Sequence, residues 1–295
     1  MIPYITYNDM IKDINENIWK IPKDIDGVIA VPRSGVIPAI IIAMYFHIPL
    51  TTVDIFLNSK APYEAFTSFG GGLRFYQTIK KDKELKKFLV IDDTYASGNS
   101  MKKTKEKLKN FNYDFVYSSM YLEGKKEDGI LCLKDLSDLK SISKIGFNLY
   151  EWNIFCHFLE HKFLFDIDGF IFYEPPLDTN IEKYEAYIKN PILKHKVIDT
   201  GNLPIDFLTY RLVKYQKETI ESLVSNGINV GKIYMYNAQT IEERNKIPSY
   251  LFKASFYKSH DEYLLYVESD DYQAKMIHNI SGKPVFSVEK NCIYN

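Results

Sequence analysis

The sequence has few of the residues that characterise several classes of protein. It contains three cysteines, Cys132, Cys156 and Cys292, which form no CxxC pair and do not have the spacing of metal ligands. Disulfide scaffolds and zinc modules are therefore excluded, and reduced thiols in a cytoplasmic protein are expected. The formal net charge is -1, so no bulk attraction to nucleic acid exists, and no nucleic-acid partner is expected.

Long hydrophobic runs are also missing. The longest, IPAIIIAMYF at residues 37–46, is too short to span a bilayer, which takes about 20 apolar residues. Residues 1–17 lack the basic and apolar segments of a signal peptide. We therefore expect a cytoplasmic protein that does not span a membrane.

Strand-like and helix-like patterns alternate along both halves of the chain. The first half is expected to hold strands at residues 27–32, 49–56, 87–92 and 115–123 and helices at residues 36–46 and 101–110. The second half is expected to hold strands near residues 163–168, 204–210, 232–237, 263–271 and 284–289 and helices at residues 211–227, 247–259 and 273–281. This alternation predicts an α/β fold with two doubly wound domains, residues 1–158 and 159–295. Residues 58–82, with three consecutive glycines, break the pattern and predict a long mobile loop.

Two acids followed by a hydroxyl-rich loop stand at the carboxyl end of the strand at residues 87–92. Ligands of open α/β sheets bind at this end of the strands. The carboxylates of Asp92 and Asp93 suit sugar hydroxyls, or a Mg²⁺ ion that bridges to phosphate. The loop from Thr94 to Ser100 opens a helix, and its backbone N–H groups and hydroxyls suit a phosphate.

The string VIDDTYASGNS, residues 90–100, resembles the 5-phosphoribosyl-1-diphosphate (PRPP) motif of type I phosphoribosyltransferases, with Ser97 in place of the usual threonine. The resemblance covers roughly residues 20–125. It implies that VPRSG, residues 31–35, is the diphosphate loop and that residues 58–82 form the lid. The implied PRPP-binding residues are Arg33, Ser34, Gly35, Asp92, Asp93, Thr94, Ala96, Ser97, Gly98, Asn99 and Ser100.

The same resemblance implies substitution at C1 of the ribose, with the diphosphate leaving together with Mg²⁺. Ala96 occupies the position where base-specific members of the family often carry an acid. This counts against a 6-oxopurine acceptor, although adenine-type members also carry alanine there.

A second acidic pair, Asp166 and Asp168, ends the strand that begins at residue 163. In an extended chain, carboxylates separated by one residue point the same way. One can act as a nucleophile and the other as a general acid, with Mg²⁺ neutralising the site.

The order of motifs downstream resembles that of haloacid-dehalogenase (HAD) phosphatases, over residues 162–290, with room for only a small cap. The resemblance implies that Asp166 is the nucleophile, that Asp168 is the acid/base, and that Thr209 and Lys253 bind the phosphoryl group. Asp166, Asp168 and Asp270 are the implied Mg²⁺ ligands. Alternatives remain open: Thr200 competes with Thr209, Lys258 competes with Lys253, and the third metal ligand is Glu268, Asp270 or Asp271.

The two motif sets together predict a bifunctional enzyme. It would transfer 5-phosphoribosyl from PRPP to a sugar or glycan and then remove the 5-phosphate, leaving a β-ribofuranosyl group for polysaccharide biosynthesis. The alternatives are a nucleobase phosphoribosyltransferase of the orotate or adenine type with an independent phosphatase, and a non-catalytic PRPP sensor. Expected partners are PRPP, the acceptor, and a second copy in a homodimer or glycan-assembly enzymes.

Overall fold

The computed structural model describes residues 1–61, 64–66, 85–125, 127–175, 181–194, 203–238 and 240–295. The chain divides into two compact units, residues 5–147 and residues 148–295 together with residues 1–4. Residues 1–4 belong to the second unit, and two hydrogen bonds join them to the last residue. The Ile2 N–H donates to Asn295 Oδ1 at 2.6 Å, and Asn295 Nδ2 donates to the Ile2 carbonyl oxygen at 3.1 Å. The predicted boundary at residue 158 lies inside the second unit. Most of the predicted loop at residues 58–82, and Thr200, lie outside the described residues.

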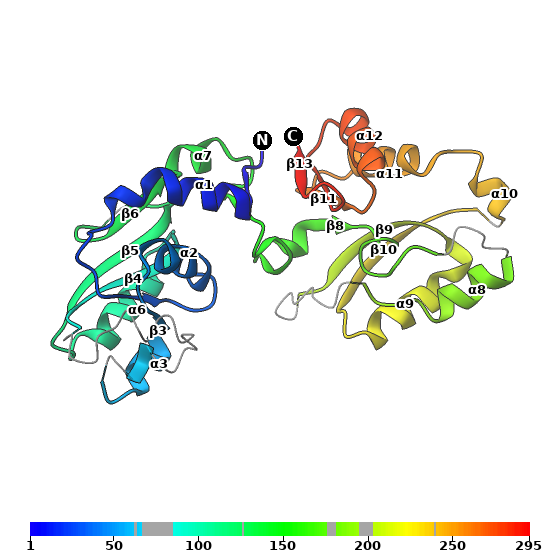
Figure 1. The fold of residues 1–295 in the computed structure, drawn as a ribbon. Helices are drawn as coiled ribbons and strands as arrows, with labels where there is room; N and C mark the ends of the chain where they lie inside the picture. Colours follow the sequence, from blue (N-terminus) through cyan, green and yellow to red (C-terminus); the bar gives the residue numbers. More distant parts are fainter. Residues whose placement is uncertain (62–63, 67–84, 126, 176–180, 195–202, 239) are drawn as a thin grey trace. The chain divides into compact units, whose positions relative to one another are not determined.

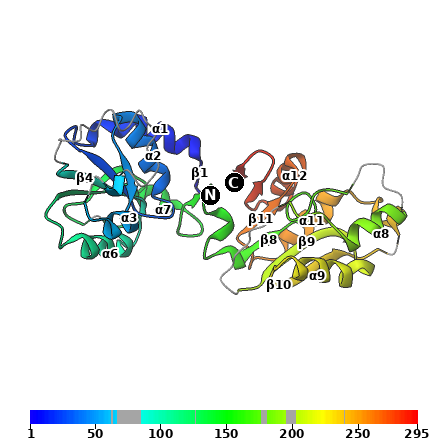
Figure 2. The same ribbon diagram turned by 60° about the horizontal axis from the view of Figure 1, so that its bottom comes forward.

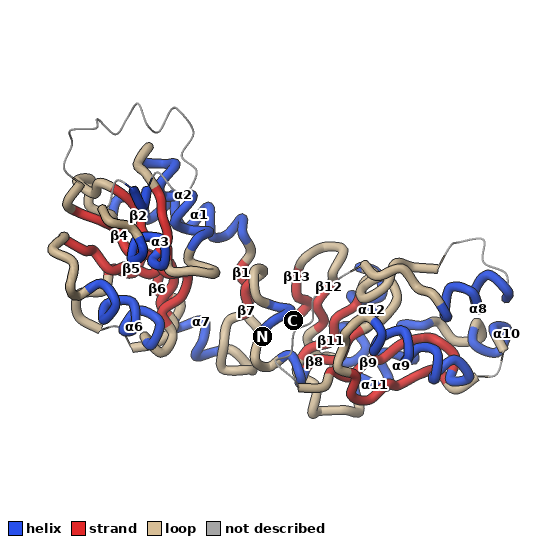
Figure 3. Tube along the Cα trace, turned by 90° about the horizontal axis from the view of Figure 1, so that it is seen from below, coloured by secondary structure: helices blue, strands red, loops and turns tan. Residues whose placement is uncertain are grey.

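The first unit is built on a sheet of five parallel strands in the order β3-β2-β4-β5-β6 (Figure 3). These strands are β2 (Gly27–Ala30), β3 (Leu50–Thr52), β4 (Lys87–Tyr95), β5 (Asp114–Leu122) and β6 (Leu131–Asp135). All four residues of β2 are buried, as expected for a parallel strand covered on both faces. The predicted α/β class and the parallel sheet of the first half are therefore confirmed.

Helices cover both faces of this sheet. They are α1 (Tyr7–Asn17), α2 (Val36–Phe46), α3 (Val53–Asn58), α6 (Asn99–Leu108) and α7 (Ser137–Ile142), and a 3-10 segment spans Ile18–Lys20. Figure 2 shows α1 and α2 on one side of the strands and α6 on the other. On the α6 side, Phe56, Phe88 and Leu108 belong to one buried apolar cluster.

The strand predicted at residues 49–56 is wrong in its second half. Strand β3 ends at Thr52, and α3 begins at Val53. The hydroxyl of Thr52 accepts a hydrogen bond from the backbone N–H of Ile55 at 3.4 Å. This cap satisfies a donor of the first helical turn, so a helix replaces the apolar strand that the composition favours.

The second unit contains a six-stranded mixed sheet in the order β10-β9-β8-β11-β12-β13 (Figure 1). The strands are β8 (Phe163–Phe165), β9 (Ile205–Leu212), β10 (Val230–Tyr236), β11 (Leu265–Glu268), β12 (Val285–Ser287) and β13 (Cys292–Tyr294). Strand β13, which the sequence patterns did not predict, runs antiparallel to β12. The other five strands of the sheet, β8 to β12, are parallel to one another.

Helices α11 (Ser249–Lys258) and α12 (Asp271–Ser281) cover one face of the second sheet, and α8 (Ile181–Lys189) and α9 (Gln216–Ser225) lie on the other (Figure 1). A short helix, α10 (Ile241–Arg244), lies between β10 and α11. The remaining 3-10 segments are Ile154–Cys156, Glu160–Lys162 and Val213–Tyr215.

The helix predicted from residue 211 begins later than expected. Strand β9 continues through Arg211 to Leu212, because β10 is long enough to pair with it as far as Tyr236. Helix α9 then begins at Gln216. The prediction that Arg211 opens a helix is therefore wrong, and its side chain belongs to a strand.

Two short strands, β1 (Tyr4–Ile5) and β7 (Leu149–Tyr150), form a separate two-stranded sheet. Over the described part of the chain, no helix combines the length and the apolar character that crossing a bilayer requires.

Candidate functional sites

The loop after β2 turns directly against strand β4. Gly35 stands at the N-terminus of α2, and a Cβ there would lie 2.4 Å from the carbonyl oxygen of Val31, 2.8 Å from that of Ile91 and 3.0 Å from the Cα of Asp92. These are all backbone atoms, which cannot move aside as a flexible side chain would. Glycine therefore lets the backbone of residues 31–35 lie against Asp92, and two stretches that the sequence separates by more than fifty residues meet here.

Arg33 and Ser34 are carried on this turn. Arg33 is exposed and Ser34 is half-buried, so both side chains are reachable from solvent. The turn adjoins the carboxyl end of β2, where the parallel-sheet rule places ligands.

The sequence predicted Asp92 and Asp93 at the tip of the strand, but they lie within β4. Strand β4 continues to Tyr95 because its neighbour β5 pairs with it as far as Leu122. Strand β2 stops at Ala30, opposite Ile91. Asp92 and Asp93 therefore still lie beyond the end of a neighbouring strand, and the Cα of Asp92 lies close to the turn at residues 31–35.

The carboxylate of Asp92 is already surrounded by hydrogen-bond donors. Its Oδ1 accepts from the backbone N–H of Asp93 at 2.9 Å, and its Oδ2 accepts from the Ser100 hydroxyl at 2.7 Å. Burial, followed by the neighbouring charge of Asp93, raises the pKa of Asp92 to about 7, although the Ser100 hydroxyl acts in the opposite direction. Such a carboxylate gains from a ligand that supplies hydroxyl donors or positive charge.

The loop between β4 and α6 is shorter than predicted. Thr94 belongs to the strand, Ala96 and Ser97 form the turn, and Asn99 and Ser100 make the first turn of α6. Gly98 caps the helix with a φ of 73°, and a Cβ there would lie 2.4 Å from the Tyr95 hydroxyl. The structure thus brings the predicted PRPP-binding residues together in one region of the first unit, and their role in binding stays a prediction.

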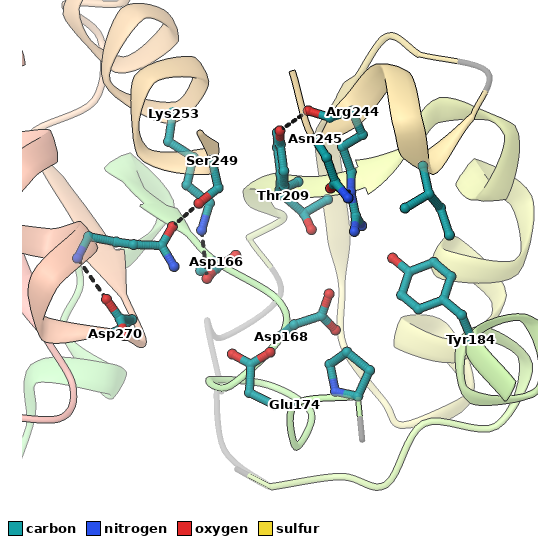
Figure 4. Close-up of a pocket in the computed structure, with 14 residues that line it drawn as sticks. Asp166, Asp168, Glu174, Tyr184, Thr209, Arg244, Asn245, Ser249, Lys253 and Asp270 are labelled. Atoms are coloured by element: carbon teal, nitrogen blue, oxygen red, sulfur yellow. Dashed lines mark hydrogen bonds and ion pairs between the residues drawn. The ribbon is translucent and has the colours of Figure 1, made fainter. Parts of the chain in front are cut away.

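In the second unit, Lys253 lies between two buried carboxylates. Its Nζ is 2.9 Å from Asp166 Oδ2 (Figure 4). The same atom is 2.8 Å from Glu268 Oε2. Burial is the largest influence on the Asp166 carboxyl, followed by the charge of Glu268, and together they raise its pKa well above the ordinary value while Lys253 opposes them. Burial disfavours the Lys253 ammonium, yet the two acids outweigh this and raise its pKa. Lys253 is therefore paired directly with the side chain that the sequence predicts to be a nucleophile.

Asp168 is held by a different cation, the fully buried Arg211. The guanidinium Nη2 donates to Asp168 Oδ1 at 2.6 Å, and Nε donates to Oδ2 at 3.0 Å. Arg211 Nη1 also donates to Thr219 Oγ1 at 3.2 Å, and the Tyr187 hydroxyl donates to Asp168 Oδ1 at 2.5 Å. Burial favours the neutral carboxyl, but Arg211 and Tyr187 together lower the pKa of Asp168 below its usual value. In this arrangement Asp168 accepts hydrogen bonds from Arg211 and Tyr187, and its role as acid/base stays a prediction.

A cavity of about 630 Å³ opens above these residues (Figure 4). Five predicted residues line it: Asp166, Asp168, Thr209, Lys253 and Asp270. Of the alternatives, Lys258 is exposed and does not line the cavity. Asp271 instead accepts from Ser287 at 2.8 Å and from Tyr294 at 2.7 Å.

The predicted Mg²⁺ ligands do not form a metal-binding cluster as they stand. Among the residues that the structure describes, no group of three or more His, Cys, Asp or Glu side chains is arranged to hold a metal ion. Lys253 and Arg211 occupy oxygens of Asp166 and Asp168, and Asp270 Oδ1 accepts from the N–H of Gln273 at 2.7 Å, capping α12. The oxygen chemistry suits Mg²⁺, but the residues do not fit it in this arrangement, and Mg²⁺ at this site stays a prediction.

Several residues of this site were missed from the sequence. Arg211 was taken for a helix start, and Tyr187, Glu174 and Arg244 were not singled out. The signal for Arg211 was present, because residues two apart on a strand share a face, and FLTYRL places Arg211 with Thr209. For Tyr187 on α8 and Arg244 on α10, no sequence spacing connects them to the acids, and only the fold does.

Comparison with known proteins concerns mainly the first unit. Residues 4–133 match the family model of the phosphoribosyl transferase domain. A xanthine-guanine phosphoribosyltransferase from Idiomarina loihiensis is 28% identical over 135 residues, covering 45% of this chain and 74% of that protein.

Two solved structures are also similar. Orotate phosphoribosyltransferase from Aeropyrum pernix is 16% identical, with a TM-score of 0.32, over 48% of this chain and 76% of that one. Xanthine-guanine-hypoxanthine phosphoribosyltransferase from Helicobacter pylori is 16% identical, with a TM-score of 0.33, over 52% of this chain and 95% of that one. At these scores the two structures carry no argument about function.

Proposed function

From the phosphoribosyl transferase domain at residues 4–133, we propose that this protein transfers the 5-phosphoribosyl group of PRPP to an acceptor of the nucleobase class. A bond forms between an acceptor nitrogen and C1 of the ribose, the C1–oxygen bond to the diphosphate breaks, and the acceptor nitrogen loses its proton. The observation that carries the proposal is the close approach of Gly35 to Asp92, because it puts a backbone turn beside a carboxylate pair.

This juxtaposition suits the two ends of PRPP. The turn at residues 31–35, with Arg33 exposed on it, would receive the diphosphate, which enters as its Mg²⁺ complex. Asp92 and Asp93 would accept hydrogen bonds from the ribose hydroxyls, and the first turn of α6 would bind the 5-phosphate. Holding both reacting ends in place supplies much of the rate in such a substitution.

The nucleobase acceptor is supported by the relative from Idiomarina loihiensis, which is a xanthine-guanine phosphoribosyltransferase. Ala96 lacks the carboxylate that would orient a 6-oxopurine through that position. An adenine- or orotate-type acceptor therefore agrees better with this chain than guanine does.

For the second unit we propose a HAD-like phosphomonoester hydrolase. A carboxylate oxygen of Asp166 attacks phosphorus, the P–O bond to the alcohol breaks, and water later cleaves the aspartyl phosphate. Lys253 supports this role, because it holds Asp166 at 2.9 Å within the cavity of about 630 Å³. Asp168, which lines the same cavity as Asp166, would give the leaving alcohol its proton and take a proton from the attacking water.

A second candidate function joins the two units in one sequence of reactions. The acid-lined cavity of the second unit favours it, because a nucleotide-forming enzyme gains nothing from destroying its own product. The acceptor would then be a sugar or glycan, and removal of the 5-phosphate would leave a β-ribofuranosyl group. A cytoplasmic location, a homodimer and partners in glycan assembly stay predictions that accompany these candidates.

Mass spectrometry of the products separates the candidates. The wild-type chain and Asp166→Asn are incubated with PRPP, Mg²⁺ and a panel of nucleobases and sugars. A nucleotide from both proteins supports the nucleobase acceptor. A ribosylated sugar from the wild type and a phosphoribosylated sugar from the variant support the sequential reaction. PRPP binding without any product, from any acceptor, contradicts both.

A further inference from the structure

The cavity of the second unit is lined by more acids than bases. Asp166, Asp168, Glu174 and Asp270 line it, and the only cations among its described lining residues are Lys253 and Arg244. A phosphate entering this space meets several negative charges at short range, and each repulsion weakens binding unless a cation compensates it.

Most of the positive charge near these acids is already engaged. Lys253 forms ion pairs with Asp166 and Glu268, both within 2.9 Å. Arg211 does not line the cavity, and its guanidinium is bonded to Asp168 and Thr219. By contrast, no ion pair among the described residues joins Arg244 to a carboxylate. Its Nε has a long contact of 3.5 Å with Asn245 Oδ1, and its side chain also forms a hydrogen bond with Tyr184, which carries no formal charge.

The guanidinium of Arg244 is held over two aromatic rings. Its Cζ lies 5.3 Å from the ring centre of Tyr210 and 5.7 Å from that of Tyr184. Figure 4 shows the side chain of Arg244 extending into the cavity beside Thr209, on the wall opposite Glu174. Contacts of this kind orient a guanidinium while leaving its N–H groups available to a ligand.

The backbone beneath Arg244 is also anchored. The Tyr210 hydroxyl donates to the carbonyl oxygens of Arg244 and Ile247. Tyr210 in turn packs against Tyr236, with ring centres 4.9 Å apart, and Tyr236 packs edge-on against Phe252 at 5.1 Å. The segment that carries Arg244 is therefore fixed before any ligand arrives, which reduces the entropy lost on binding.

We propose that Arg244 is the anion-binding residue of this cavity and pairs with a phosphate group of the substrate. This inference rests on the proposed phosphatase activity of the second unit. Arg244 supplies the positive charge for the phosphate, because Lys253 is already paired with Asp166 and Glu268. The phosphate that Arg244 binds is either the one being hydrolysed or a second phosphate on the same substrate, because a guanidinium fork recognises both in the same way.

The test compares Arg244→Gln with Lys246→Gln in the full chain. Lys246 is an exposed neighbour that does not line the cavity. Each variant removes one positive charge, but only Arg244→Gln removes it from the cavity. Steady-state hydrolysis is measured with p-nitrophenyl phosphate, glucose 6-phosphate and glucose 1,6-bisphosphate, and inorganic phosphate is titrated by calorimetry. Loss of a charged hydrogen bond predicts a KM or Kd about 10- to 100-fold higher in Arg244→Gln, and unchanged values in Lys246→Gln.

A KM that rises for all three esters assigns Arg244 to the phosphate being hydrolysed. A rise confined to the bisphosphate assigns it to a second phosphate. Equal KM and equal phosphate affinity in Arg244→Gln and wild type overturn the inference. If the wild type hydrolyses none of the esters, the phosphatase proposal fails, while the phosphate titration still decides the role of Arg244.

Discussion

Arg211 donates hydrogen bonds to both carboxylate oxygens of Asp168, from Nη2 to Oδ1 at 2.6 Å and from Nε to Oδ2 at 3.0 Å. The arginine side chain has no exposed surface, and that of Asp168 is 18% exposed. The pair is therefore nearly desolvated, and each charge depends on the other. Arg211, which favours the ionised form of Asp168, comes from the adjacent strand, where the sequence predicted a helix. The role of Asp168 as the general acid stays a prediction.

Replacing Arg211 with Met should destabilise the second unit strongly. The substitution leaves the Asp168 carboxylate partly buried without its cation, which costs about 3–5 kcal/mol of unfolding free energy. Urea unfolding of the full chain at neutral pH measures the loss. The exposed helix residue Lys217 provides the control, because Lys217→Met removes the same charge from α9 without uncovering a buried partner.

The double variant Arg211→Met with Asp168→Asn sharpens this test. If the cost comes from the stranded charge, the double variant should recover part of the stability lost by Arg211→Met. Additive losses in the double variant would show that Arg211 acts through contacts other than Asp168.

Replacing Lys253 with Met should make the stability of the second unit depend more strongly on pH. Asp166 and Glu268 lose their shared cation, and the pKa of Asp166, already raised by burial and by Glu268, rises further. The folded variant then binds protons that the unfolded chain has released above about pH 4, so its stability falls as pH rises. The deficit relative to wild type should be about 3–5 kcal/mol at pH 8 and smaller at pH 5, by urea unfolding. Lys258→Met, at an exposed position of the same helix, should show no such trend.

Replacing Gly35 with Ala should damage the first unit. The new Cβ would meet the carbonyl oxygens of Val31 and Ile91 and the Cα of Asp92, so the turn at residues 31–35 or strand β4 must shift. Overpacking of this kind costs about 1–3 kcal/mol, visible as a lower Tm. Ser34→Ala adds no atoms to the same turn and is the control. An unchanged Tm and unchanged PRPP affinity in Gly35→Ala would contradict the close approach.

The first unit was the more predictable of the two because its signals are local. The continuous apolar run at residues 36–46 gave the bounds of α2, and GVIA and KFLVID gave the buried parts of β2 and β4. The end of β4 was missed because it depends on pairing with β5, which no local pattern reports. The cap at Thr52 was missed because PLTTVDIF reads as a strand by composition.

The second unit shows the limit of local signals more clearly. Asp166, Asp168, Thr209, Lys253 and Asp270 were all selected from strand ends and helix starts, and the fold brings all five to one cavity. Arg244 lines the same cavity, and Tyr187 contacts Asp168, from helices that no sequence spacing ties to these acids. The charged partners of these acids therefore come from other elements of the fold, and no local pattern of the sequence predicts them.

Asp92 provides a prediction in which stability and binding move in opposite directions. Its pKa is raised to about 7 by burial and then by Asp93, so between about pH 4 and pH 7 the folded chain holds a proton that the unfolded chain has lost. The stability of the first unit should therefore fall as pH rises through this window. Asp92→Asn removes that dependence and should exceed wild type by on the order of 1–3 kcal/mol at pH 8, with the two converging near pH 4.

The same substitution should weaken PRPP binding by about 10- to 100-fold, because the ribose hydroxyls lose a charged acceptor. Urea unfolding across pH 4–8 and PRPP titration at pH 8 give the two readouts, with the exposed Asp128→Asn as the control. A variant that is both less stable at pH 8 and unimpaired in PRPP binding would show that Asp92 is a structural carboxylate. The expected pairing, a more stable chain that binds PRPP poorly, would mark Asp92 as a residue whose buried charge is kept for its ligand at the expense of stability.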